Sequence, residues 1–501
     1  MANASLKNKL DKLKDDGFFD NLVIKRGVEK EFFRVNKNGY ISKKSHPESL
    51  GSALTNRYIT TDFAEAQVEL VTPVFEDVNA LYDFLYSLHV FVAQNIDKNE
   101  MLWPFSMPPK IKKESDINLG FYHQSNIGLL KHVYRRGLKV RYGPTMQCVS
   151  GMHYNFSIKP SSLSIFNSSS DQKNIDSAYL GLIRNFKRLF WFVLSEFGQT
   201  NIVDKSFIKN REHILKELNE EDMYLKNATS LRMSEIGYQS KAQKDLGIKY
   251  NSLSGFLEKI KNAITVPYPE FEKKELKDHE GNYHQISNGI IQIENEYYDS
   301  IRPKRSSTDN MRPYDLLKNF GIEYVEVRGI DISPHDLTGM SIHQMHFLDL
   351  VLLYCLIKPS PEISDEEKNE IDSNDYKAIY KGRDEGIEIL IGGVETNIRS
   401  AKNKIIKDLQ LLAGYLKESN SIHESIEIAL NCKKGIISDD SFHNTGLEKA
   451  KSNIKDLRSD CTKDIDSIKK EAELSLDELN KIQRNSKEEM DEYVKNYNLS
   501  L

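Results

Sequence analysis

Features that would mark a specialised class of protein are scarce in this chain of 501 residues. Its four cysteines, Cys148, Cys355, Cys432 and Cys461, are widely spaced and form no CxxC pair. That spacing argues against a zinc site or a disulfide scaffold and favours a reducing compartment. Lys and Arg number 69 against 74 Asp and Glu, and the resulting net charge of -5 does not suggest a nucleic-acid-binding protein.

Long apolar runs are also missing. The most apolar stretch, FLDLVLLYCLI at 347–357, contains an aspartate and is about half as long as the roughly 20 residues that a spanning helix needs. We interpret it as a buried helix. The first residues, MANASLKNKLDKLKDDGFFD, mix Lys and Asp and lack the apolar core of a signal peptide. We therefore expect a soluble, cytoplasmic protein with no membrane and no nucleic-acid partner.

The common phosphate-binding loops are absent, since the chain has neither GxxxxGK[ST] nor GxGxxG. The stretch HEGNYH at 279–284 has one residue too many for the zinc motif HExxH. Its Gly-Asn pair would also break the helix that the motif requires. We expect a loop there.

Strand-like runs alternate with helical periodicity up to about residue 340. The predicted strands are 27–35, 65–74, 146–158, 290–298 and 322–331, and the predicted helices are 6–15, 78–97, 175–197 and 343–357. The acidic, turn-rich stretch 358–375 is expected to be a surface loop. After about residue 400 the chain is dense in Lys, Glu, Asp and Leu, which predicts amphipathic helices packed on the main body. We expect two regions, 1–340 around the sheet and a mainly helical 341–501.

Acidic side chains recur on one face of the predicted strands. In RGVEKEFFRVN, Glu29 and Glu31 lie two apart, so both carboxylates face the same side of an extended chain. The same alternation gives Glu65, Gln67 and Glu69; His153, Asn155 and Ser157; Gln292, Glu294 and Glu296; and Glu326 with Arg328. An antiparallel sheet with one solvated face would explain this without any function. Carboxylates are poor strand formers, however, and their convergence favours Mg²⁺, which takes oxygen ligands and leaves room for phosphate.

Two basic runs supply the opposite charge. They are KHVYRRGLKVRYG at 131–143 and SIRPKR at 300–305. A solvated surface is the ordinary outcome for such a run. The interleaved Tyr134, Tyr142 and Tyr298 fit either a pocket or single-stranded nucleic acid, and the small net charge favours the pocket. Carboxylate-held Mg²⁺ facing Arg and Lys is a layout for phosphoryl transfer.

Taken together, these motifs resemble the proteobacterial type of glutamate–cysteine ligase. The matching segments occur in the family's order over roughly residues 20–340: RGVEKEFFRVN, HPESLGSALTNRYITTDFAEAQVELVTPV, MLWPFSMP, YRRGLKVRYG, MQCVSGMHYNFS, LRMSEIGY, QIENEYYDSIRPKR and YVEVRGIDISP. The resemblance implies an α+β fold with a curved, mainly antiparallel catalytic sheet of the glutamine synthetase-like kind, flanked by helices, with a helical C-terminal part. It implies a monomer that uses ATP to join the γ-carboxyl of L-glutamate to L-cysteine through a γ-glutamyl phosphate. The products would be γ-glutamylcysteine, ADP and phosphate, in the first step of glutathione biosynthesis.

The resemblance also implies roles for individual residues. The ligands of Mg²⁺, with Mn²⁺ as an alternative, would be Glu29, Glu31, Asp62, Glu69 and Glu326. Arg135 and Arg328 would neutralise charge on the transferred phosphoryl group. The cysteine pocket would be lined by Tyr134, Leu138, Val149, Arg232, Tyr238 and Tyr298, with His153 nearby as a substrate-site residue. From the second basic run we expect contacts with ATP by Arg302, Lys304 and Arg305.

Two alternatives stay open at this point. A related carboxylate–amine ligase that uses a different amine would have the same metal-binding face and differ only in the cysteine pocket. A non-catalytic binder of single-stranded nucleic acid would use the Arg- and Tyr-rich runs and would show strong salt dependence. The net charge of -5 disfavours the second alternative.

Overall fold

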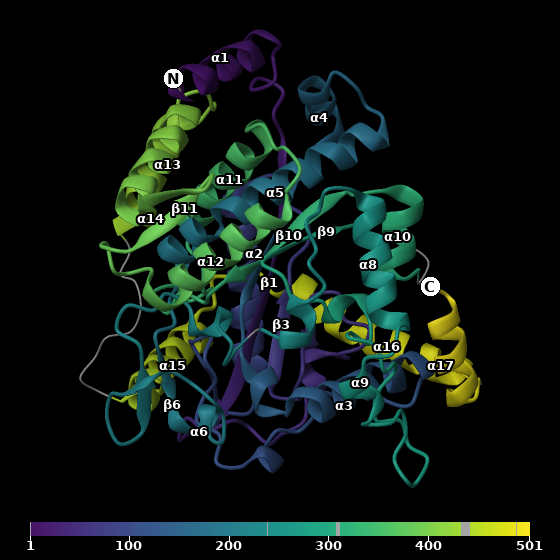
Figure 1. Ribbon diagram of the computed structural model, residues 1–501. Helices are drawn as coiled ribbons and strands as arrows, with labels where there is room; N and C mark the ends of the chain where they lie inside the picture. The colour runs from purple at the N-terminus through teal and green to yellow at the C-terminus, as the bar shows by residue number, and fades with distance from the viewer. Residues whose placement is uncertain (1, 238, 307–310, 432–440, 487) are drawn as a thin grey trace.

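A seven-stranded antiparallel sheet forms the centre of the protein (Figure 1). The computed structural model describes residues 2–237, 239–306, 311–431, 441–486 and 488–501. The strands run in the order β2-β3-β1-β5-β10-β9, and β4 pairs with the end of β1. Their bounds are β1 Ile24–Asn36, β2 Ile59–Thr61, β3 Gln67–Val71, β4 Glu100–Leu102, β5 Met152–Ile158, β9 Ile301–Lys304 and β10 Tyr324–Ile330. The predicted α+β class with a mainly antiparallel sheet is confirmed.

The two faces of β1 differ chemically because its side chains alternate. Lys30 points to the helix side, where its Nζ lies 2.8 Å from His89 Nε2 on α2 (Val78–Asn95). Arg26 points the same way and binds Asp349 of α11 (Ile342–Ile357) at 2.6 Å. Helix α5 (Gln172–Phe197) packs on β9 and β10. The helices therefore cover one face of the sheet, and Glu29 and Glu31 lie on the other.

The remaining helices surround this centre. They are α1 Ala2–Asp15, α3 Asn126–Tyr142, α4 Pro160–Asn167, α6 Lys205–Ile208, α7 Lys241–Lys244, α8 Leu253–Thr265, α9 Pro269–Glu272, α10 Pro313–Phe320 and α12 Asp365–Lys381. Two smaller sheets join them: β6 Ile202–Asp204, β8 Asp222–Tyr224 and β7 Lys216–Glu217, and the hairpin β11 Glu388–Ile391 with β12 Val394–Asn397. The hairpin was not predicted. Among the described residues, no helix is long and apolar enough to cross a membrane.

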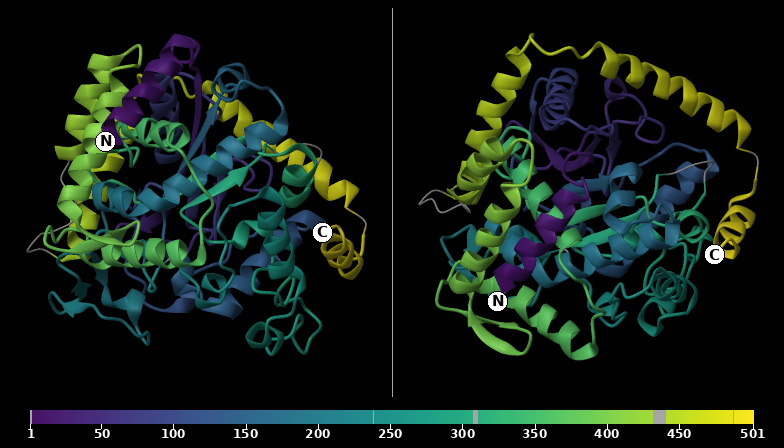
Figure 2. Two further views of the ribbon diagram at one scale, coloured as in Figure 1. Left: turned by 45° about the horizontal axis from the view of Figure 1, so that its top comes forward. Right: turned by 90° about the horizontal axis from the view of Figure 1, so that it is seen from above.

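The helices predicted after residue 400 are present and lie along the outside of the molecule (Figure 2). They are α13 Ile398–Ala413, α14 Ser419–Asn431, α15 Phe442–Ser459, α16 Asp466–Asn485 and α17 Met490–Leu499. Helices α15 and α16 pack on α2, and α17 packs on α3. One apolar core extends from Leu10 to Ala472, so it crosses residue 340. The division into two regions at that residue stays a prediction.

The surface loop predicted for 358–375 is wrong over most of its length. Helix α12 begins at Asp365, where the side chain of Ser364 accepts a hydrogen bond from the backbone N–H of Glu367. The acids of its first turn favour the positive end of the helix dipole. Acidic residues that look like a solvated loop are here the start of a helix.

The strand predicted for 290–298 is also wrong. The backbone N–H of Gln292 donates to Glu296 Oε2 at 2.8 Å, so the chain curls back on itself. A short 3-10 turn at Glu294–Glu296 follows from this. The loop predicted around 279–284 is confirmed, because no helix or strand element covers it.

Among the described residues the cysteines are free thiols, buried at Cys148 and Cys355 and exposed at Cys461. Cys432 and the predicted pocket residue Tyr238 lie outside the described residues.

Candidate active site

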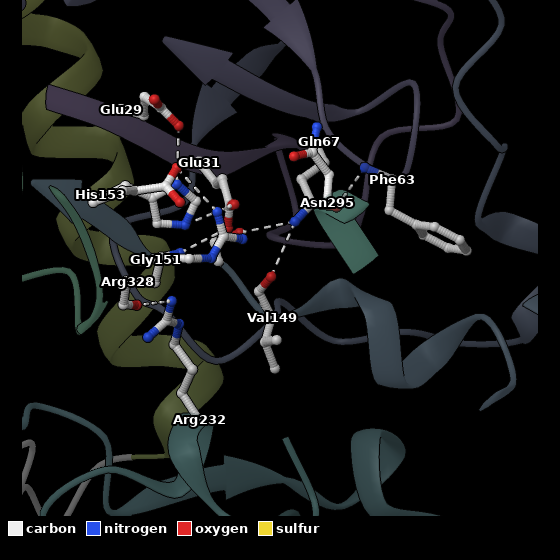
Figure 3. Close-up of polar contacts among 12 residues, drawn as sticks. Glu29, Glu31, Phe63, Gln67, Val149, Gly151, His153, Arg232, Asn295 and Arg328 are labelled. Atoms are coloured by element: carbon white, nitrogen blue, oxygen red, sulfur yellow. Dashed lines mark hydrogen bonds and ion pairs between the residues drawn. The ribbon is translucent and has the colours of Figure 1, made fainter. Parts of the chain in front are cut away.

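Four neighbouring strands place acidic or imidazole side chains on the face of the sheet that the helices leave open, and Figure 3 shows Glu29, Glu31 and His153 among them. The pairing of β1 with β3 sets Glu31 opposite Glu69. The pairing of β1 with β5 sets Glu29 opposite His153. Glu326 follows on β10, and Asp62 comes directly after β2. Residues far apart in the sequence thus meet because the register of the sheet aligns them.

His153 lies between two carboxylates. Its Nδ1 is 3.1 Å from Glu29 Oε2 and its Nε2 is 3.4 Å from Glu31 Oε1. Burial and the nearby charge of Arg328 lower the pKa of His153 to about 4, so the ring is neutral at neutral pH. A neutral imidazole has only one N–H, so one nitrogen presents a lone pair to a carboxylate. Because both groups at that contact are hydrogen-bond acceptors, a proton or a cation between them would stabilise it.

Glu29, Glu69 and His153 each offer a ligand atom, and these atoms all lie within 4.8 Å of one another. Burial would raise the pKa of Glu29, but its hydrogen bond with His153 brings that pKa below its usual value. Burial and the neighbouring acids Asp62, Glu29 and Glu31 raise the pKa of Glu69 well above its usual value. Burial and Asp62 raise the pKa of Glu31 to about 8. Sequence reasoning placed His153 with the substrates, whereas the geometry groups it with the candidate metal ligands.

Glu326 differs from the other acids because three cations surround it. Arg302 donates to Glu326 Oε2 from Nε at 3.1 Å and from Nη2 at 2.8 Å. Arg328 Nη1 lies 3.3 Å and Lys304 Nζ 3.7 Å from Oε1. Burial alone would raise the pKa of Glu326, but the charges of Lys304, Arg302 and Arg328 lower it well below its usual value. Glu326 is therefore fully ionised and fully paired.

A small cavity of about 60 Å³ opens beside the acidic face. Four of the residues predicted for the cysteine pocket line it: Tyr134, Leu138, Val149 and Tyr298. Glu31, Asp62 and Arg328 line its side toward the sheet. Sequence reasoning missed Gln147, which also lines the cavity and accepts a 3.0 Å hydrogen bond from the Tyr298 hydroxyl. The only signal for it was its place inside the segment MQCVSG.

Arg232 does not belong to the residues that line this cavity. It is buried, donates from Nη2 to the backbone oxygen of Arg328 at 2.9 Å, and lies 3.8 Å from Asp331. A Cβ added at Gly151 would lie 1.9 Å from its guanidinium, so the glycine is needed for this close approach. Arg232 therefore supports the backbone at Arg328 and packs closely on Gly151. The backbone N–H of Gly151 in turn donates to Glu31 Oε2 at 3.0 Å.

Arg135 likewise contacts backbone oxygens rather than the cavity. It donates to the carbonyl oxygens of Asp62, of Thr61 at 3.2 Å and of Lys131 at 2.9 Å. Its guanidinium also lies 4.4 Å from the ring centre of Tyr122. The side chain therefore fixes the turn that presents Asp62.

A second, largely apolar pocket begins on the other side of Glu326. Arg302 and Lys304 line it together with Phe256, Leu257, Ile260 and Tyr314. Arg305, predicted to act with them, points elsewhere and donates to the backbone oxygen of Gly321 at 3.1 Å. Asn295 lines both this pocket and the small cavity, so the two lie on either side of one segment.

Three acids that the alternation placed on the same face have other partners. Glu65 accepts hydrogen bonds from the backbone N–H of His46 at 2.8 Å and of Phe121 at 2.6 Å. The other two lie on the segment that is not a strand: Glu294 pairs with Arg312 and Glu296 pairs with Arg141. Glu65 and Glu296 therefore stabilise the structure around the site, whereas Glu294 also lines the apolar pocket.

The sequence model of the family described as Glutamate-cysteine ligase matches residues 10–378. The chain belongs to this family. It is 40% identical over 400 residues to the glutamate–cysteine ligase of Pseudomonas entomophila (strain L48), covering 79% of this chain and 75% of that protein. It is 37% identical over 482 residues to the glutamate–cysteine ligase of Wigglesworthia glossinidia brevipalpis, covering 92% and 95%.

Solved structures agree with this membership. The glutamate–cysteine ligase of Francisella tularensis, solved in complex with AMP, superposes with a TM-score of 0.88 at 28% identity, covering 96% of this chain and 98% of that one. A bifunctional glutathione synthetase from Pasteurella multocida shares the fold with a TM-score of 0.60 at 20% identity, covering 94% of this chain and 53% of that one. As a glutamate–cysteine ligase, the protein is an enzyme of the first step of glutathione synthesis, as its motifs predicted.

Proposed function

We propose that this glutamate–cysteine ligase phosphorylates the γ-carboxyl of L-glutamate at the acidic face and that the amine of L-cysteine then attacks from the small cavity. One observation carries the proposal. The small cavity touches the acidic face through Glu31 and Asp62, reaches the cations around Glu326 through Arg328, and shares Asn295 with the apolar pocket. These neighbouring sites suit an amine, an acyl group, phosphates and a nucleotide base.

We propose Glu29, Glu69 and His153 as the first ligands of a divalent cation, with Glu31 and Asp62 beside them. The raised pKa of Glu69 and of Glu31 supports this, because burial and the neighbouring acids outweigh the nearby arginine charge, and a bound cation would favour the ionised acids. Oxygen donors suit Mg²⁺, and the one imidazole also suits Mn²⁺. When bound, such ions stabilise the charge of the transferring phosphoryl group.

The cations around Glu326 are proposed to contact the phosphates of ATP. Arg302 and Lys304 line the apolar pocket, and Arg328 lines the small cavity, so the three reach both sides of Glu326. Phosphates would compete with Glu326 for these cations and would free its carboxylate to join the other ligands. The apolar walls of the pocket suit a nucleotide base, and the Francisella tularensis relative was solved with AMP.

The other residues of the site are proposed to hold the cysteine substrate or to keep the reacting side chains in position. Leu138 and Val149 give the small cavity apolar walls for the short side chain of cysteine. The Tyr298 hydroxyl lies at the cavity and can donate to a bound carboxylate in place of Gln147. A carboxylate is a poor acyl donor, and phosphorylation supplies the leaving group, phosphate, that the attacking amine displaces. Arg135 keeps Asp62 in place, and Arg232 keeps the Arg328 backbone in place.

The first test is ADP release by the purified protein with Mg²⁺ and ATP, with glutamate and cysteine omitted in turn and the product identified by mass. Turnover that needs both amino acids and yields γ-glutamylcysteine supports the proposal. Release that needs glutamate but is indifferent to cysteine would favour a ligase with a different amine. We also propose that the enzyme is active as a monomer, which light scattering during the assay would test.

A further inference from the structure

A third cavity, distinct from the apolar pocket and larger than the cavity proposed for cysteine, lies behind Tyr298. Its volume is about 240 Å³. Helices α5 and α12, which pack against each other, line it together with Met233 and with residues from the segments 239–248 and 297–300. Tyr298 lines both this cavity and the small one. The proposed reaction uses none of its other side chains.

Three lysines and three aspartates line this cavity, but they are not paired one to one. Each lysine that lines it has an acidic partner: Lys187 Nζ lies 2.5 Å from Asp299 Oδ1, Lys244 Nζ lies 3.0 Å from Glu235, and Lys368 pairs with Asp372. Asp299 is further satisfied by the hydroxyls of Tyr250 and Tyr297. One acid is left, Asp375, whose Oδ1 is buried and receives no hydrogen bond from any described residue.

Two tyrosines follow this acid along the same helix. Tyr376 and Tyr380 also line the cavity, and their ring centres are 4.6 Å apart. A carboxylate beside aromatic faces is the combination that holds ammonium groups, because the ring faces carry negative potential. We propose that this cavity binds a small organic cation whose ammonium group lies between Asp375 and the rings of Tyr376 and Tyr380.

The electrostatics of Asp375 agree with such an occupant. Burial raises the pKa of Asp375 to about 8, which keeps much of it protonated near neutral pH. A bound cation favours the ionised form, so binding would release a proton. This gives the proposal a signature that a purely apolar ligand would not produce.

The occupant would also affect the small cavity. Gln243 lines the larger cavity, and its Oε1 accepts a 2.8 Å hydrogen bond from the backbone N–H of Tyr298. Its Nε2 donates to the backbone oxygen of Glu296 at 3.0 Å. Gln243 therefore fixes the backbone at both Glu296 and Tyr298. A ligand that moves Gln243 moves Tyr298, and we expect the KM for cysteine to change while that for ATP stays constant.

The test is calorimetric titration of the whole protein, without ATP, glutamate or cysteine, using choline and its uncharged isostere in which carbon replaces nitrogen. We expect choline to bind about tenfold or more tightly than the isostere, in line with the strength of a desolvated cation–aromatic contact. We also expect a heat that varies with the ionisation enthalpy of the buffer. Failure here would leave the ADP-release assay unaffected, so the two proposals are separable.

Matched variants locate the site. Asp375→Asn keeps the shape and removes the charge, and it should abolish both the preference for choline and the proton release. Asp372→Asn removes a paired acid one turn earlier on α12 and should leave that preference in place. Equal affinity for choline and its isostere in the wild type would overturn the proposal. So would unchanged choline binding by Asp375→Asn.

Discussion

Replacing Glu31 by Gln should make the metal-free protein more stable while removing its activity. Glu31 is buried, and its pKa is raised from 4.5 to about 8 by burial and by the charge of Asp62. Between these two values the folded protein holds a proton that the unfolded chain releases. The free energy of unfolding therefore falls as the pH rises through this range. Gln resembles the protonated acid at all pH values and has no such penalty.

The gain can be estimated from the shift. Each pH unit above the unfolded pKa costs about 1.4 kcal/mol, so at about pH 7.5 the burial of Glu31 costs up to about 4 kcal/mol. An unfolding entropy of about 2.1 cal/mol/K per residue gives about 1 kcal/mol per degree for a chain of this size, so Tm should rise by up to about 4 °C. At about pH 5.5 the same arithmetic gives a rise of only about 1 °C.

The assay is thermal unfolding with a chelator present, at both pH values, for wild type, Glu31→Gln and the control Glu65→Gln. The control acid accepts two backbone hydrogen bonds, from His46 and Phe121. An amide can accept only one of them, so Glu65→Gln should lower Tm at both pH values. A Tm gain in Glu31→Gln that is the same at both pH values, or a loss, would refute the reasoning.

Three further variants test the roles of other residues. Glu29→Gln should leave the circular dichroism spectrum unchanged and abolish ADP release, because it removes one charged ligand at constant volume; normal turnover would contradict the metal assignment. Arg302→Met should raise the KM for ATP by about tenfold or more, since charged hydrogen bonds are worth about 1.5–3 kcal/mol, whereas the outward-pointing Arg305→Met should change it little. Tyr298→Phe should raise the KM for cysteine by about fivefold, the value of one hydrogen bond, and equal effects on the KM for glutamate would count against the pocket.

The sequence predicted the acidic face where local alternation and sheet pairing agree. Glu29 and Glu31 alternate on β1, and the register then brings Glu69 and His153 opposite them. The same alternation failed for Glu296, because its carboxylate accepts the backbone N–H of Gln292 and closes a turn. Periodicity reports which side chains could share a face, and it does not report which backbone hydrogen bonds the chain forms.

The positioning residues were beyond reach of the sequence for a different reason. Arg135 and Arg232 were expected at the transferred phosphate and in the cysteine pocket. In the structure their guanidinium groups contact the backbone oxygens of Asp62 and Arg328. A contact between a side chain and a distant backbone oxygen leaves no pattern in the sequence, because any residue type can supply the oxygen. The roles of Arg135 in neutralising the phosphoryl group and of Arg232 in the cysteine pocket stay predictions.

Charge is graded across the sheet, and this gradient follows from the strand order β2-β3-β1-β5-β10-β9. Acids with raised pKa values lie on β1, on β3 and just after β2, and His153 lies on β5. The cations Arg302, Lys304 and Arg328 lie on β9 and β10. Phosphates would be attracted to the cations of the last two strands. On the first three strands, divalent ions would replace the protons that the raised pKa values retain and would add positive charge for the phosphates. The proposed metal ions and ATP should therefore bind cooperatively, each lowering the electrostatic cost of the other.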